Sequence, residues 1–315
     1  MIRRRVLKSV GGHDPQFGAQ DGYELWLRLM GRCKVANVQT PLFSYRQHAN
    51  SMSTDRDALH AARRAITRAM AMRHVGPVRP RCVVIVPVKN TYPHFANVAL
   101  APFAGSSLLD YTLDCARAAG CFDVVYLSSD DARVVAHVAD RPKHIARLRD
   151  PRLSDPEVQL EEVVRGAVED LEANFGVFPD ILAILNVHTP LRSPEQVREA
   201  LDTLLVHDVD QVVSTCEGRE MHFRHGRRGL EPINFGARRS LRLEREAVYT
   251  GNGAVHVLWR DALRTAGLFD GRIGHIVMSS EDGLMAKFPE ERMRAEALLR
   301  GRAAVETREE PVCDC

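Results

Sequence analysis

The chain has 315 residues, which is enough for about two domains that each bury a core of their own. Hydrophobic residues make up 45% and charged residues 27%, the balance of an ordinary globular protein. With 43 basic against 41 acidic residues the formal net charge is +2, so the overall charge calls for neither a nucleic-acid nor a membrane partner.

The N-terminus and the cysteines favour a cytoplasmic setting. The first residues, MIRRRVLKSVGGHD, are basic but lack an apolar stretch of signal-peptide length behind them. No run of roughly 18 apolar residues, the length a membrane span needs, occurs in the chain. The seven cysteines are odd in number, scattered and without CxxC spacing, which favours a reducing compartment over a disulfide framework or a zinc site.

The first part of the chain is predicted to be small and mainly helical. Residues 20–29, QDGYELWLRL, begin with an acid and continue as an amphipathic helix pattern. Residues 54–74 are alanine-rich and also helical in character, and the glycine and prolines of the VGPVRPR that follows break any helix. We therefore predict a segment at 1–75 and a linker at 76–81.

After the linker, strand and helix patterns alternate. Residues 82–88, CVVIVPV, form a continuous β-branched run of the kind found in buried parallel strands. Further strands are predicted at 123–129, 180–187, 211–216 and 254–259, and helices at 107–119, 131–139, 156–174 and 193–206. This alternation predicts an α/β fold with a mostly parallel, doubly wound sheet over 82–302, followed by a tail at 303–315.

In such sheets, ligands bind beyond the carboxyl ends of the strands. Three strands deliver polar side chains at that end: Lys89 and Asn90; Ser128, Ser129, Asp130 and Asp131; Asn186, His188, Thr189 and Arg192. Capping of the next helix remains an open alternative for Asp130 and Asp131. We predict one crevice for an anionic, hydroxyl-rich ligand, lined by Lys89, Ser129, Asn186 and Arg192, with Lys89 and Arg192 as its charge partners.

Residues 82 to about 300 resemble the CMP-sialic acid synthetase family, cytidylyltransferases that activate nine-carbon acidic sugars with CTP. The resemblance rests on seven blocks in the family's order: VVIVPVK, PFAGSSLLDYTLDCA, VVYLSSDDARV, RPKHI, LNVHTPLRSPEQV, LEREAVYTGNGAVHV and PEERMRAEALL. It implies a nucleotide-diphospho-sugar transferase-like fold and a homodimer. It also implies synthesis of a CMP-sugar and pyrophosphate from CTP for surface glycans, normally with Mg²⁺.

The resemblance also implies roles for individual residues. Lys89 would contact phosphate and serve catalysis, and the nucleotide would be held by Lys89, Asn97, Ser129, Arg141, Asn186, Thr189 and Arg192. The sugar would be held by Arg245, Asn252 and His256. Alternatives stay open for all three: a solvated charged run for Arg245, a turn residue between glycines for Asn252, and a packed interior histidine for His256.

Two departures from the family pattern concern catalysis. The loop after the first strand, NTYPHFANVAL, carries Pro93 where the family has a lysine that cradles the triphosphate. Met285 and Lys287 stand where the family has a metal-binding Asp-x-Asp, and neither offers the oxygen ligands that magnesium prefers. Glu281 and Asp282 lie just upstream, and Asp282 is the candidate replacement ligand. The alternative function is a catalytically impaired, nucleotide-sugar-binding scaffold attached to a glycosyltransferase.

Residues 1–75 resemble the C-terminal end of inverting glycosyltransferases of the A-type fold. Asp21 would stand at the position of the base that deprotonates the acceptor, with Gln20 in place of the preceding Glu, and PLFSYRQH would match a later strand. The front half, with the nucleotide site, is absent, so the resemblance implies a glycosyltransferase front half as a partner. A helical docking or dimerisation appendage is the alternative.

A basic segment lies between the last two predicted strands. MHFRHGRR has no spacing typical of a metal site and is interpreted as a flexible loop. In length and position, the longer stretch HFRHGRRGLEPINFGARR resembles the family's protruding dimerisation segment.

Overall fold

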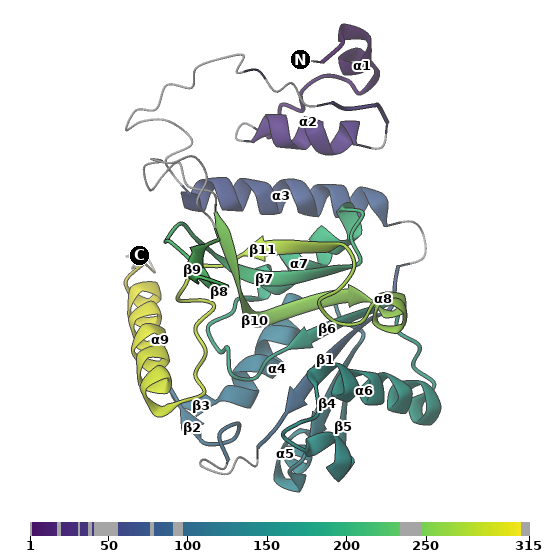
Figure 1. Ribbon diagram of the computed structural model, residues 1–315. Coiled ribbons are helices and arrows are strands. Elements are labelled where there is room, and N and C mark those ends of the chain that lie inside the picture. Colours follow the sequence, from purple (N-terminus) through teal and green to yellow (C-terminus); the bar gives the residue numbers. More distant parts are fainter. Residues whose placement is uncertain are drawn as a thin grey trace, which may run out of the picture. The chain divides into compact units, whose positions relative to one another are not determined.

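The computed structural model describes residues 2–17, 20–30, 32–36, 40, 56–75, 79–90, 97–233 and 247–309. The chain forms two compact units, Met1–Val78 and Arg79–Cys315 (Figure 1). Within the described part of the chain, no helix combines the length and the hydropathy that crossing a bilayer requires.

The described residues of the first unit include the helices α1 (Arg4–Ser9), α2 (Asp21–Leu29) and α3 (Arg56–His74). A buried ion pair organises it: the Arg28 guanidinium donates to both carboxylate oxygens of Glu24, each at 2.6 Å. Arg28 also donates to the carbonyls of Val10 and Gly12, which ties the turn after α1 to α2. The acid at 24 is therefore part of this unit's internal packing, because both of its oxygens are used there.

In the described residues, seven strands form the sheet of the second unit. Their order across the sheet is β11 (Ile273–Val277), β7 (Gln211–Gly218), β10 (Val248–Trp259), β6 (Ile181–Leu185), β1 (Cys82–Val88), β4 (Val124–Ser129) and β5 (His144–Leu148). All neighbouring pairs are parallel except the two that β10 makes with β6 and β7. The predicted α/β fold with a mostly parallel sheet is thus confirmed.

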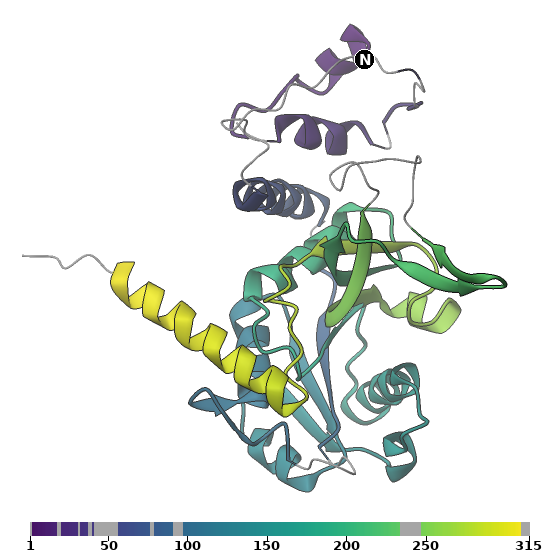
Figure 2. The ribbon, with the colours of Figure 1, turned by 60° about the vertical axis from the view of Figure 1, so that its left-hand side comes forward.

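Helices cover both faces of this sheet (Figures 1 and 2). The helical elements are α4 (Leu108–Ala119), α5 (Ala132–Val138), a 3₁₀ turn at Pro151–Ser154, α6 (Leu160–Phe175), α7 (Pro194–Val206), α8 (Arg260–Thr265) and α9 (Pro289–Glu309). Along β1, Val84 and Val86 join the hydrophobic cluster that includes α4 and α7, whereas Val83 and Ile85 join the cluster that includes α6. Because successive side chains point to opposite faces, a strand covered on both sides is apolar throughout.

The helix starts follow local sequence signals. Ser193 caps α7 in a capping box with Gln196, and Pro194 occupies the first turn. Ser107 caps α4, and Asp131 caps α5 by accepting a hydrogen bond from the amide of Arg133 at 2.8 Å. The capping alternative for Asp131 is therefore the one that the structure shows.

Several element boundaries and short strands differ from the prediction. Helix α6 begins at Leu160 rather than at 156, and α9 continues through Glu309 into the predicted tail. The strands β5 and β11 were not predicted, because each is a five-residue edge strand with a weak hydrophobic pattern.

The basic segment forms a hairpin, not the predicted flexible loop. It consists of β8 (Phe223–Gly226) and β9 (Gly229–Pro232), and it projects from the sheet (Figure 2). Gly226 pairs with Gly229 across a two-residue turn, and Gly229 takes a φ of 113°, which favours glycine. Arg224 and Glu231 pair across the strands at 3.5 Å. A smaller hairpin, β2 (Pro102–Phe103) with β3 (Ser106–Ser107), precedes α4.

Candidate functional site

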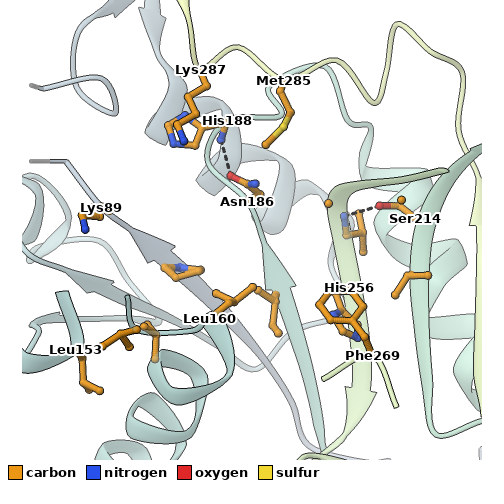
Figure 3. A pocket seen from close by; sticks show the side chains of 18 of the residues that line it. Lys89, Leu153, Leu160, Asn186, His188, Ser214, His256, Phe269, Met285 and Lys287 are labelled. Carbon is orange, nitrogen blue, oxygen red and sulfur yellow. Dashed lines mark hydrogen bonds between the residues drawn. The ribbon is translucent and has the colours of Figure 1, made fainter. Parts of the chain in front are cut away.

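A cavity of about 860 Å³ opens at the carboxyl edge of the sheet (Figure 3). The ends of β1 and β6, the middle of β7 and β10, the segment between β5 and α6, and the segment before α9 all contribute to its wall. Its polar lining residues are Lys89, Arg149, Ser154, Asp155, Asn186, His188, Ser214, Thr215, Tyr249, His256 and Lys287. The cavity therefore lies where parallel α/β sheets bind their ligands.

Three cationic side chains line this cavity, and we call Lys89, Arg149 and Lys287 the cavity cations. Lys89 donates from Nζ to the carbonyl oxygen of Ser154 at 2.7 Å, and Arg149 donates from Nη2 to the carbonyl oxygen of Val88 at 2.7 Å. These bonds hold both cationic side chains close to the end of β1. Among the described lining residues, Asp155 is the single carboxylate, so the cavity favours an anionic ligand.

The segment carrying Lys287 is tied to the loop after β6. The amide of Ala286 donates to the carbonyl oxygen of His188 at 2.6 Å, and the Ala286 side chain is fully buried. His188 in turn donates from its amide to Oδ1 of Asn186 at 2.9 Å. Burial, reinforced by the nearby positive charges of Lys287 and Arg292, lowers the pKa of His188 to about 4. His188 is therefore neutral at pH 7.

His256 forms the cavity floor as a neutral ring of defined tautomer. The side-chain amide of Gln211 donates to the carbonyl oxygens of Gly267 and Asp270, which fixes its orientation. The Gln211 oxygen then faces Nε2 of His256 at 2.7 Å and also accepts from the amide of Phe269. Because that oxygen only accepts, Nε2 carries the proton. Burial lowers the pKa of His256 to about 4.

An aromatic wall faces this floor. The ring of Phe269 stacks on His256 with centroids 4.8 Å apart, and 63% of Phe269 is exposed. Phe269 has a φ of 65° and stands between Gly267 and Gly271, which also take positive φ values. Tyr249 adds a second half-exposed ring, 4.4 Å from His275. Sequence reasoning missed both aromatic residues; the closely spaced glycines of GLFDG were the available signal for a tight, functional loop.

Three of the predicted site residues line the cavity: Lys89, Asn186 and His256. The other two members of the predicted crevice, Ser129 and Arg192, do not. Ser129 is fully buried, and its hydroxyl oxygen accepts from the amide of Asp131 at 3.2 Å. Of the four side chains predicted to line one crevice, Lys89 and Asn186 line this cavity, and Ser129 and Arg192 lie outside its lining.

Arg192 and Thr189 form what we call the buried brace. From Nη1, Arg192 donates to the carbonyl oxygens of Asn186 and Ala254 at 3.0 and 2.7 Å, and to Oγ1 of Thr189 at 2.9 Å. Thr189 donates back to the carbonyl oxygen of Asn186 at 3.0 Å. Thr189 is fully buried and Arg192 is only 4% exposed, so Arg192 is not the predicted charge partner of a ligand. The brace holds the loop after β6 against β10.

Asn97 and Arg141 also lie outside the main cavity. The amide of Asn97 donates to the carbonyl oxygen of Asn90, and its side-chain oxygen receives a long bond from Nδ2 of Asn90 at 3.4 Å. Arg141 forms an ion pair with Asp110 in the first turn of α4. It also lines a second cavity, of about 570 Å³, at the amino ends of β4 and β5. The predicted nucleotide role of Arg141 does not agree with that position.

Asn252 turns its side chain into the sheet. Its Oδ1 accepts from the hydroxyl of Ser214 at 2.5 Å and from the amide of Ala254 at 3.1 Å, and its Nδ2 lies 3.5 Å from Sδ of Met278. The bond to the amide two residues on is an Asx turn, which is the turn alternative left open by the sequence. The neighbouring Gly251 and Gly253 line the cavity. A sugar contact by Asn252 stays a prediction.

Both carboxylate oxygens of Asp282, the candidate metal ligand, accept hydrogen bonds from other side chains. Asp282 accepts from Nε2 of Gln196 at Oδ2 and from Nη2 of Arg302 at Oδ1, both at 2.7 Å, which links α7 to α9. The role of Asp282 as a magnesium ligand stays a prediction, and in this structure its two oxygens serve Gln196 and Arg302. No group of three or more His, Cys, Asp or Glu side chains that could hold a metal ion occurs in the described ranges. With a thioether and an ammonium at Met285 and Lys287, these residues do not fit a magnesium site.

Some predictions fall on residues about which the structure says nothing. Arg245, Pro93 and the stretch PLFSYRQH lie outside the described residues. Asp21 is the first residue of α2, and its side chain is not among those described. The predicted roles of Asp21 and Arg245 therefore stay predictions.

The chain is similar in sequence to curated sugar cytidylyltransferases. It is 24% identical over 214 residues to N-acylneuraminate cytidylyltransferase of Streptococcus agalactiae serotype III, covering 66% of this chain and 50% of that protein. It is 26% identical over 121 residues to pseudaminic acid cytidylyltransferase of Campylobacter jejuni serotype O:2, covering 38% of this chain and 52% of that protein. The chain thus spans about half the length of the curated relatives it matches. No protein-family model matches it.

Solved structures show the same fold. A structure of CMP:2-keto-3-deoxy-manno-octonic acid synthetase complexed with CTP aligns with a TM-score of 0.52 at 16% identity, covering 70% of this chain and 99% of that one. The 4-diphosphocytidyl-2C-methyl-D-erythritol synthase of Anaerococcus prevotii aligns equally well, with a TM-score of 0.52 at 10% identity and the same coverage. The second unit of the chain therefore has the fold of these cytidylyltransferases.

Proposed function

We propose that the second unit is a cytidylyltransferase that couples CTP to an acidic sugar of the nonulosonic or octulosonic class, giving a CMP-sugar and pyrophosphate. The observation that carries the proposal is the cation-lined cavity at the carboxyl edge of a cytidylyltransferase fold. A triphosphate and a sugar carboxylate are both anionic, and the cavity offers three cations against one carboxylate among its described lining residues. The similarity to two sialic-acid-type cytidylyltransferases supports the sugar class.

In this reaction the anomeric hydroxyl of the sugar attacks the α-phosphorus of CTP. A new O–P bond forms, the bond from the α-phosphorus to the bridging oxygen breaks, pyrophosphate leaves, and the hydroxyl proton passes to solvent. Little covalent chemistry falls to the protein, so positioning and charge neutralisation supply the rate. Lys89 and Arg149 would meet the phosphates at the end of β1. The rings of Tyr249, His256 and Phe269, which also line the cavity, would enclose a ring of the ligand.

The direct test is release of pyrophosphate by the full chain with CTP and a panel of acidic eight- and nine-carbon sugars, with and without Mg²⁺. We expect pyrophosphate with at least one sugar. If CTP binds but none of the sugars supports release under either condition, the activity is refuted and the nucleotide-sugar-binding scaffold becomes the better account.

Lys89 offers a residue-level test of the same proposal. Replacing it by alanine should weaken CTP binding by about 1–3 kcal/mol, because a charge-assisted hydrogen bond is lost. The matched control is Lys34→Ala, which removes the same charge from an exposed site in the first unit. Equal CTP affinities for the two variants, measured by calorimetry, would remove Lys89 from the site.

We also propose that the chain forms a homodimer through the β8–β9 hairpin. Phe223, Leu230 and Ile233 are 48%, 63% and 57% exposed on or next to it, which is unusual for large apolar side chains. Light scattering at micromolar concentration should give a dimer, and Leu230→Asp should shift it to monomer. A monomeric wild-type chain would rule the proposal out.

The glycosyltransferase hypothesis for the first unit is a further proposal and rests on the sequence resemblance alone. Its test is the coding sequence immediately upstream. An in-frame glycosyltransferase front half would support it, and an unrelated upstream sequence would favour the docking-appendage alternative.

A further inference from the structure

We propose that side-chain cations, with Lys287 as the decisive one, neutralise the phosphates of the nucleotide, so that CTP binds to this chain without a divalent metal ion. The inference rests on the proposed function and adds how the site handles charge. It starts from the disagreement described above: the described residues at this site do not fit magnesium.

The described wall around Lys287 offers few ligands for magnesium. Met285, which has a thioether, and Lys287 both line the cavity. Asp155 is the single carboxylate of the described lining, and its Oδ1 accepts from the amide of Glu157 at 2.9 Å. Magnesium needs several oxygen ligands in octahedral geometry and usually takes one or two carboxylates from the protein. An ammonium on the same wall would also repel the ion.

The backbone at Lys287 is held by hydrogen bonds on both sides. On one side, the amide of Ala286 is bonded to the carbonyl oxygen of His188. On the other side, Glu291 accepts from the amides of Lys287 and Phe288 at 3.0 and 2.9 Å, which fixes the start of α9. The backbone that carries the ammonium is thus held from both directions. A cation on a fixed backbone neutralises phosphate with less ordering cost than one on a mobile loop.

The positive charges lie at separate points of the cavity wall. Lys89 approaches the cavity from the end of β1 and Arg149 from the end of β5, whereas Lys287 approaches from the segment before α9 (Figure 3 labels Lys89 and Lys287). Cations at separate points of the wall can meet different phosphate groups of one polyphosphate chain. This is the neutralisation that a bound magnesium ion supplies elsewhere.

The experiment is isothermal titration of the full chain with CTP, once in EDTA and once in excess Mg²⁺. We expect dissociation constants that agree within about threefold, because the protein supplies the counter-charge itself. Lys287→Ala should weaken binding in EDTA about tenfold or more, as expected for losing a charge-assisted hydrogen bond. Lys287→Arg should stay close to wild type, and Lys34→Ala is the charge-matched control.

A double variant replaces the thioether and the ammonium by magnesium-binding carboxylates. Met285→Asp combined with Lys287→Asp places two carboxylates on the same wall, so CTP binding should become metal-dependent, at least tenfold tighter in Mg²⁺ than in EDTA. Wild-type binding that is tenfold or more tighter in Mg²⁺, or Lys287→Ala binding unchanged, would overturn the inference and leave the proposed function standing. No CTP binding under either condition would overturn both.

Discussion

The carboxyl edge of the sheet holds two groups of cationic or hydroxyl side chains that look alike in the sequence and differ in the structure. The cavity cations Lys89, Arg149 and Lys287 face an open space of about 860 Å³. The buried brace of Thr189 and Arg192 faces inward, and a single nitrogen of Arg192 serves three acceptors. Lys89 and Arg149 follow strands, as Thr189 and Arg192 do, yet only the cavity cations line the cavity.

The hydrogen-bond partners of the two groups distinguish cavity-lining residues from structural ones. Arg192 bonds two main-chain carbonyls that are far apart in the sequence, those of Asn186 and Ala254, so its Nη1 joins two segments, while Nε and Nη2 are buried without a hydrogen-bond partner among the described residues. Lys89 and Arg149 also donate to carbonyls, but they remain part of the cavity wall. Substitutions in the brace should therefore change stability, and substitutions among the cavity cations should change ligand affinity.

Arg192→Met gives the largest effect expected from this comparison. It removes the donor from three buried acceptors, of which the Asn186 carbonyl keeps its bond from Thr189, so we expect the free energy of unfolding to fall by about 2–4 kcal/mol. Urea unfolding measures it. Lys287→Ala is the contrasting variant, for which we expect a change within about 0.5 kcal/mol. If both variants lost the same stability, the division into brace and cavity cations would fail.

The neutral histidine under the cavity predicts a pH effect of up to about 3 kcal/mol. In the folded chain the pKa of His256 is about 4, whereas the unfolded residue titrates near its ordinary 6.5. Between pH 4 and 6.5 the unfolded state binds more protons than the folded state. The contribution of neutral His256 to the free energy of unfolding is therefore fully present above pH 6.5 and is lost as the pH falls toward 4. His188 acts in the same direction.

The measurement is the slope of the unfolding free energy against pH between 6.5 and 4, in wild type and in His256→Gln. The variant should have the shallower slope, because it removes one of the groups that gain a proton on unfolding. Equal slopes would mean that His256 is not held neutral by burial.

Thr189→Val tests the brace at smaller cost. The substitution keeps the shape and removes the hydroxyl that links Arg192 to the loop after β6, so we expect a loss of about 1 kcal/mol in unfolding free energy. CTP affinity should stay within twofold of wild type, because Thr189 is fully buried and does not line the cavity. A large loss of affinity at unchanged stability would place Thr189 among the ligand contacts.

Asp282→Asn should have the smallest effect. Its partner Arg302 is 40% exposed, so the weakened ion pair should cost less than about 1 kcal/mol. Pyrophosphate release and CTP affinity should both stay near wild type, because both carboxylate oxygens serve Gln196 and Arg302. Turnover that drops sharply while CTP affinity is kept would restore Asp282 as a metal ligand.

Local sequence patterns specify the layered fold and the edge of the sheet at which the cavity lies. The apolar run of β1 and the alternation of strands with helices specify a parallel sheet covered on both faces, since these patterns arise from local periodicity. The position of Lys89 and Asn186 at the cavity follows from the same rule, because both come directly after parallel strands. The cap of α7 is equally local.

Which polar side chains at that edge face inward depends on contacts between segments that are separated along the chain. The Arg192–Ala254, Asp282–Arg302 and His256–Gln211 bonds each join segments that are distant in the sequence. Whether a guanidinium, carboxylate or imidazole meets a ligand or an internal partner depends on what the fold brings within about 3 Å of it. No pattern of spacing along the chain encodes that distance.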